Sequence, residues 1–242
     1  ISVGANTLTL SGGGSLVSGG LTLNNADSKL LLNSITLDNA TTSADSLGLD
    51  VDNNSTITTL SVGHITPVSI ASGRSLSGAI TLTAGSIKLD EAGELASTIS
   101  MSGGVLDADN SSTLSGTLTQ AGNITIDVAD DKTLTYSGDE ISLGANTLTL
   151  SGGGTLVSGG LTLNDADSKL LLNSITLDNV STSANSLGID VDGNSTVTSL
   201  SVAHTTPVSI ASGRTLSGAI TVSAGSIKLD EAGTLASTIA MS

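Results

Sequence analysis

Aromatic, basic and sulfur-containing residues are scarce in this 242-residue chain. It contains no Cys, Trp or Phe, a single Tyr and two Met. The absence of Cys excludes a disulfide framework, a thiolate metal site and a cysteine nucleophile. The absence of Trp and Phe removes the rings on which bases or sugars stack. The chain has only 7 Lys and Arg but 22 Asp and Glu, and the resulting net charge of −15 disfavours nucleic acid and anionic lipid as partners.

The residues that are present suit a folded β-rich chain. Hydrophobic residues make up 38% of the sequence and mean hydropathy is +0.30, both too high for a typical disordered chain. No apolar run approaches the roughly 18 residues of a membrane helix, and no signal peptide is recognisable. Since the chain starts at Ile1 and not at Met, we expect it to be an excerpt of a longer array.

A long repeat runs through the chain. Residues 1–102 align with residues 141–242 at a constant offset of 140, without gaps, and 17 of the 102 pairs differ. We therefore divide the chain into a first full repeat unit, 1–140, and a partial second unit, 141–242, that continues the same array. Near-identity of the copies suggests recent duplication, so the recurrence of a residue is weak evidence that it matters.

A shorter period of about 20 residues lies inside the long one. Apolar anchors recur at intervals of 19, 19, 19 and 20 residues: Ile57, Leu76, Leu95, Leu114 and Leu134. Apolar residues also stand eight and six places before each anchor, separated from it by a five-residue polar turn such as 52–56. Alternating apolar residues indicate short strands, because successive side chains point to opposite faces. Asp, Asn, Gly and Ser between them favour turns.

These periods predict an all-β parallel β-helix (β-solenoid), with rungs of about 20 residues, two or three short strands per rung and no helices. Each anchor should lie over its counterpart one rung away, so that Ile57 lies over Leu76. The 27-residue step from Leu30 to Ile57 predicts a longer loop within 40–46. A bacterial immunoglobulin-like sandwich is the main alternative, but it usually carries buried aromatics and repeats at about 100 residues.

Acidic turn residues are the candidate metal ligands. Asp90, Asp109 and Asp52 share one turn position, which would stack them into a ridge where carboxylate oxygens could bind Ca²⁺. The segments 50–53 and 190–194 also resemble the start of an EF-hand loop, without its distal Glu. The candidate calcium ligands are Asp50, Asp52, Asp90, Asp109, Asp190 and Asp192. The alternative is that these carboxylates are simply solvated and screened; no other cofactor is indicated.

No residue pattern predicts catalysis. His64 and His204 each precede a Pro-bearing turn and have no Asp, Ser or second His at a useful spacing, so a turn role is favoured over a general base. Arg74 and Arg214 are expected to neutralise carboxylates of adjacent rungs. A polysaccharide-acting β-helix enzyme would require clustered Asp and Lys or Arg, which are not seen. We therefore predict a non-enzyme.

Hydroxyl residues flank the anchors and predict an outward ladder on one face. A T-x-T array on a flat solenoid is one arrangement that binds ice, and a solvated strand face is the alternative. Glu94, Ala96, Lys29 and Leu31 would interrupt this ladder. Its expected members are Thr7, Thr9, Thr56, Thr58, Ser75, Ser77, Thr113, Ser115, Thr133 and Thr135.

The segments GRSLSGAITLTAGSIKLDEAGELASTI (73–99) and NSSTLSGTLTQAGNITIDVADDKTLTYSG (110–138) resemble the tandem-repeat β-helix regions of bacterial surface proteins. These include filamentous-haemagglutinin-like and autotransporter-type adhesins and giant envelope repeat proteins. The resemblance implies export to the cell surface and a role as shaft, spacer or adhesive fibre. Its implied partners are adjacent repeats, further copies in a fibre or matrix, and an unidentified surface ligand; it transfers no functional residues. A surface module that binds ice or Ca²⁺-bridged partners is the alternative.

Overall fold

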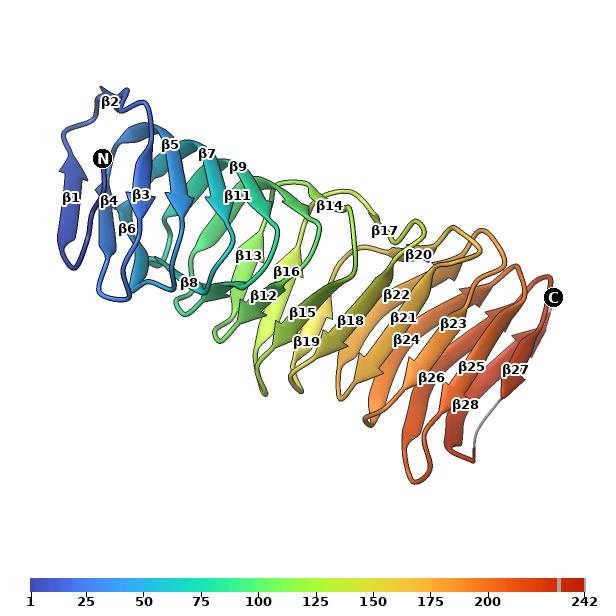
Figure 1. The fold of residues 1–242 in the computed structure, drawn as a ribbon. Helices are drawn as coiled ribbons and strands as arrows, with labels where there is room; N and C mark the ends of the chain where they lie inside the picture. The colour runs from blue at the N-terminus through green and yellow to red at the C-terminus, as the bar shows by residue number, and fades with distance from the viewer. Residues whose placement is uncertain (230–231, 242) are drawn as a thin grey trace. The chain divides into compact units, whose positions relative to one another are not determined.

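The described chain consists of β-strands joined by turns. A computed structural model describes residues 1–229 and 232–241, and its internal contacts divide the chain into two compact units, 1–121 and 122–242. No helix occurs among these described residues, as expected, and none could therefore span a membrane. Figure 1 shows the strands of each unit lying side by side as successive rungs. The boundary at residue 140 concerns sequence repetition and stays a prediction.

The first unit contains two parallel sheets. One sheet has the order β1 (Thr7–Ser11), β4 (Lys29–Asn33), β6 (Gly48–Asn53), β8 (Thr66–Ile70), β10 (Ser86–Leu89) and β12 (Val105–Ala108). The other has the order β2 (Ser15–Leu16), β5 (Thr36–Thr42), β7 (Ser55–Val62), β9 (Ser75–Leu82), β11 (Glu94–Met101) and β13 (Ser112–Leu114), with β3 (Leu21–Leu23) beside β5 and β14 (Leu118–Gln120) beside β11. Each rung thus supplies two or three strands, as predicted.

The second unit repeats this arrangement. Its first sheet has the order β15 (Ile124–Val128), β18 (Thr147–Ser151), β21 (Lys169–Asn173), β23 (Gly188–Val191), β25 (Thr206–Ile210) and β27 (Ile227–Leu229). Its second sheet has the order β16 (Thr133–Tyr136), β19 (Thr155–Val157), β22 (Thr176–Thr182), β24 (Ser195–Val202), β26 (Thr215–Val222) and β28 (Thr234–Met241), with β17 (Ile141–Ser142) beside β20 (Leu161–Leu163) and β20 beside β22.

The core is a stack of aliphatic columns between the two sheets. Leu76 pairs with Leu95, and Leu95 pairs with Leu114, on three successive rungs. All three side chains are at most 1% exposed. One rung cannot bury its apolar face alone, so each of these side chains depends on the rungs above and below. The predicted stacking of the anchors is confirmed at these positions.

Two columns are shifted in register by two residues, where the spacing predicted no shift. Ile57 pairs with Gly78, and Leu76 pairs with Ser55, so Ile57 does not lie over Leu76. Ile87 likewise pairs with Thr66, two residues away from the position that the spacing predicts. A slip of two residues keeps every side chain on its own side of the strand, because the pleat has a period of two. The inward and outward sides are therefore the same in both registers, although the observed one places the buried hydroxyl residues Ser55 and Thr66 opposite Leu76 and Ile87.

A glycine makes the first of these slips possible. Gly78 has φ = 125°, and a Cβ atom built there would lie 1.7 Å from the carbonyl oxygen of Ile57. No other residue fits so close to the neighbouring backbone. Gly218 has the same geometry against Val197 in the second unit, with φ = 126° and a Cβ–oxygen distance of 1.7 Å.

The longer loop expected within 40–46 is not found. Leu30 pairs with Leu49 in one sheet, while Leu37 pairs with Ile57 in the other. The apparent 27-residue step arose because Leu30 and Ile57 belong to different sheets, and the anchor in the rung of Leu30 is Leu37, 20 residues before Ile57. Residues 40–42 end β5, and only 43–47 form the turn before β6.

Candidate functional site

Lysine side chains approach three of the candidate calcium ligands. Lys29 Nζ lies 2.7 Å from Asp50 Oδ2, on the neighbouring strand. Lys169 Nζ lies 2.6 Å from Asp190 Oδ2 in the equivalent place of the second unit. These side chains are about one third exposed, so each pair is a surface ion pair worth roughly 0–1 kcal/mol.

Asp90 and Asp109 follow paired residues on adjacent rungs, as the predicted acidic ridge requires, because Leu89 pairs with Ala108. The Ser69 hydroxyl donates a hydrogen bond to Asp90. Lys88 is hydrogen-bonded to Asp109 and lies 3.4 Å from Asp107. The hydrogen bond with Asp109, opposed by partial burial and aided by the charge of Asp107, raises the pKa of Lys88.

Asp52 does not share the Asp90–Asp109 column. Asp90 follows Leu89, which pairs with Val68, whereas Asp52 follows Val51, which pairs with Ile70. Asp52 is therefore two positions farther along the strand than the Asp90–Asp109 column. Asp52 and its equivalent Asp192 are both exposed. Within 1–229 and 232–241 no three His, Cys, Asp or Glu residues gather as metal ligands would. Calcium binding by the six candidate residues stays a prediction.

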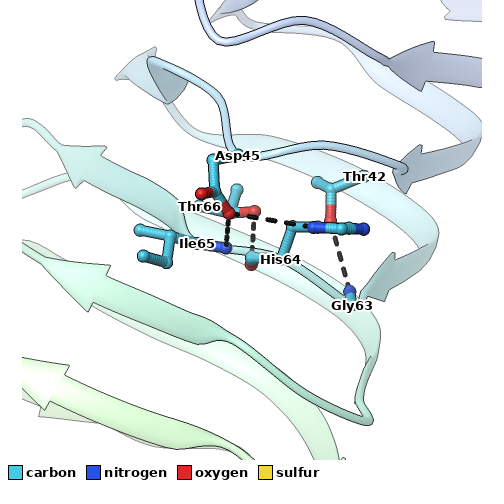
Figure 2. Close-up of polar contacts among 6 residues, drawn as sticks. All are labelled: Thr42, Asp45, Gly63, His64, Ile65 and Thr66. Carbon is cyan, nitrogen blue, oxygen red and sulfur yellow. Dashed lines mark hydrogen bonds and ion pairs between the residues drawn. The ribbon is translucent and has the colours of Figure 1, made fainter.

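His64 lies in a turn beside Asp45, as Figure 2 shows. Asp45 Oδ1 accepts a hydrogen bond of 3.0 Å from the backbone N–H of Ile65 and lies 3.7 Å from His64 Nδ1. The second unit has Asn185 in place of Asp45, and its amide oxygen accepts the equivalent bond from Thr205 at 3.0 Å. Asp45 and Asn185 thus accept the same backbone hydrogen bond, although only Asp45 is charged. This shared bond beside His64 and His204 supports a structural role of both histidines in the turn.

Asp38 holds a glycine-rich loop of the preceding rung, a contact that spacing did not indicate. Its carboxylate accepts hydrogen bonds from the N–H and hydroxyl of Ser18 and from the N–H of Gly19. These bonds, led by the Ser18 N–H and opposed by desolvation, lower the pKa of Asp38 from 3.8 to about 2. The only sequence signal was the recurrence of this Asp 140 residues later.

Asp178 makes the same contact in the second unit, with Ser158 and Gly159. Burial acts to raise the pKa of Asp178, but hydrogen bonds from Asn179, Gly159 and Ser158 outweigh it and lower the pKa overall. Both carboxylates therefore serve as loop anchors that function in the ionised form.

The hydroxyl ladder expected beside the anchors is not continuous. Thr7 and Thr9 lie on β1, in the sheet opposite Thr56. Thr56 pairs with Ser77, and Ser77 pairs with Ala96. The ladder is therefore interrupted in the second sheet, as its composition indicated, and two of its expected members belong to the other sheet.

A different hydroxyl column runs unbroken along the first unit. Its members point outward. On β5, β7, β9 and β11 each is the next-to-last residue of the strand, and the neighbouring strands β3 and β14 contribute further members. Each pairs with the next along the sheet: Ser2, Thr22, Thr41, Ser61, Thr81, Ser100 and Thr119. The second unit has a similar column of Ser142, Thr162, Ser181, Ser201 and Thr221. In it Thr162 is buried, and Thr221 pairs next with Ala240, so the row of hydroxyls ends there. We name these two columns, with their flanking columns below, the hydroxyl faces.

A flanking column lies two residues earlier on the same strands. In the first unit it contains Asn39, Thr59, Ala79 and Thr98. In the second it contains Asn179, Ser199, Ala219 and Thr238. None of these residues carries a charge. The signal in the sequence was a Ser or Thr between the two apolar residues of a third pair, as in 80–82 and 99–101, although Thr41 and Thr119 are each followed by a polar residue.

A shallow hollow lies on each hydroxyl face. In the first unit it measures about 170 Å³ and is lined by Asn39, Ala40, Thr41, Thr59, Leu60, Ser61 and Thr81. In the second it measures about 230 Å³ and includes Asn179, Ser181, Ser199 and Ser201, with Glu140 at its border. The hollows thus occupy equivalent places in both units and present hydroxyl and amide groups to solvent.

Comparison with known proteins returns no relative. No protein-family model, curated protein or solved structure matches the chain. The fold and the surfaces described above therefore carry the functional argument.

Proposed function

We propose that the chain is a structural segment of a long extracellular fibre, acting as a rigid shaft or spacer and not as an enzyme. The observation that carries this proposal is the repetition of one rung in both units. Aliphatic columns and parallel ladders make every rung support the next, which suits a load-bearing element that can be lengthened by adding copies.

The surface charge is compatible with this role. The outer face of the first sheet pairs Lys29 with Asp50 and Lys88 with Asp107, and the excess of carboxylates leaves the chain strongly acidic. Like-charged surfaces repel one another, which keeps neighbouring shafts soluble and separate. A location on the bacterial cell surface is the expectation that comes from the resemblance to surface repeat proteins.

A series with one, two and four copies of the 140-residue unit tests the shaft. Each copy contains seven strands of the first-sheet type, so the longest dimension should grow by about 34 Å per copy at about 4.8 Å per rung. Small-angle X-ray scattering measures that dimension together with the cross-section, which should stay constant. Growth of all three dimensions with copy number would contradict a shaft.

A further inference from the structure

The hydroxyl faces combine regular spacing with uncharged column members, most of which are exposed or half-buried. In the second unit Glu140 borders the face and accepts a hydrogen bond from Ser181, and Thr162 is buried. Paired residues on neighbouring strands are about 4.8 Å apart, and the two columns are separated by about 6.6 Å along each strand. Thr41, Ser61 and Thr81 are exposed on three successive rungs. By contrast, the outer face of the first sheet carries the lysine and aspartate side chains of the ion pairs.

The side chains on these faces are held in place. Thr is β-branched and restricted at χ1, so a Thr on a rigid strand presents its hydroxyl and methyl in few orientations. Hydrogen bonds between rungs restrict some hydroxyls further: Thr59 donates to Asn39, and Thr162 and Ser181 share a bond of 2.7 Å. A ligand that binds such a surface loses little free energy to ordering the protein.

The hollows indicate the size and kind of that ligand. With 170–230 Å³ each, they can hold several water molecules, whose share of liquid volume is about 30 Å³. Their walls offer the hydroxyl and amide groups that ordered water requires. A regular array of such waters, anchored at intervals of one rung, has a repeat of the same order as the oxygen rows on a crystal of ice.

We propose that the hydroxyl faces bind ice through water ordered by Thr41, Ser61 and Thr81 and by their equivalents in the second unit. A crystalline ligand matches a surface that repeats at every rung, and the absence of charged and aromatic residues from the columns disfavours ionic ligands and stacked sugars. The ladder first expected beside the anchors is interrupted, whereas the column through Thr81 is continuous over seven positions.

The test uses the 242-residue chain with the same change made in both units. In T81K/T221K, two exposed residues of the hydroxyl faces become lysine. The matched control S72K/S212K adds the same two charges at exposed turn residues away from the faces. Circular dichroism and the thermal unfolding midpoint establish that all three proteins fold alike; face variants that failed to fold would be replaced by T81Q/T221Q.

Two assays read the outcome. We expect the wild type and the control to enter a growing ice front and to inhibit ice recrystallisation, and we expect the face variant to need about tenfold more protein for the same inhibition. Exclusion of the wild-type chain from ice would overturn the proposal, as would equal activity of the face variant or an equal loss in the control. Binding of the wild type to crystalline cellulose without ice activity would assign the faces to a glycan.

Discussion

Truncating an isoleucine at two equivalent positions of the repeat measures how much stability a rung gains from having a second neighbouring rung. Ile99 pairs with Ile80 on one side and Leu118 on the other, and is 0% exposed. Its equivalent Ile239 pairs with Ile220 and is 53% exposed. The local sequences are alike, so the comparison isolates the contribution of stacking.

The expected magnitudes differ by a factor of two or more. Ile99→Ala leaves a cavity between two occupied rungs and should lower the free energy of unfolding by about 2–5 kcal/mol. Ile239→Ala removes a side chain that is already half in solvent, and should cost about 1 kcal/mol or less by its buried apolar area.

Urea unfolding followed by circular dichroism, together with amide hydrogen exchange, provides the measurement. Exchange is included because a stack of repeats can open rung by rung and so depart from two-state behaviour. The slowed amides of β9 and β11 should lose protection in Ile99→Ala, while Ile239→Ala should affect β28. Equal costs at the two positions would refute the idea that stacking between rungs buries the core.

Three further changes test the register, the loop anchor and the acidic turns. Gly78→Ala should destabilise the first unit by more than about 1 kcal/mol in urea, because its Cβ would overlap the carbonyl of Ile57; wild-type stability would refute the slipped register. Ionised Asp38 should stabilise the fold above its unfolded pKa of 3.8 and lose that contribution as the pH falls toward its folded pKa of about 2. Asp38→Asn should therefore flatten the acid dependence of the urea midpoint, and an unaltered pH profile would oppose the anchor role. If Asp90 and Asp109 bind Ca²⁺, calcium should raise the melting midpoint of the wild type but not of Asp109→Asn; a midpoint indifferent to calcium would eliminate that site.

The candidate site was only partly predictable, and particular residues show why. The sequence indicated carboxylates at Asp50 and Asp109, but their lysine partners lie 21 residues earlier, on the preceding rung. The hydrogen bond from Ser18 to Asp38 likewise joins residues that are 20 apart in the sequence. Such contacts depend on which residues of two rungs lie opposite each other, and no local pattern specifies that.

Sequence alone determined which side of each strand faces the core, because alternating apolar residues such as Ile80 and Leu82 leave one arrangement that buries them. It also determined the rung length and the absence of helix. Only the tertiary structure decided the register, since a slip of two residues preserves the inward and outward sides while changing every partner. The glycine contact at Gly78 follows from that slip, whereas the pairing of Ser61 with Thr81 follows from a further register shift between Ile57 and Thr59. Packing between rungs sets both.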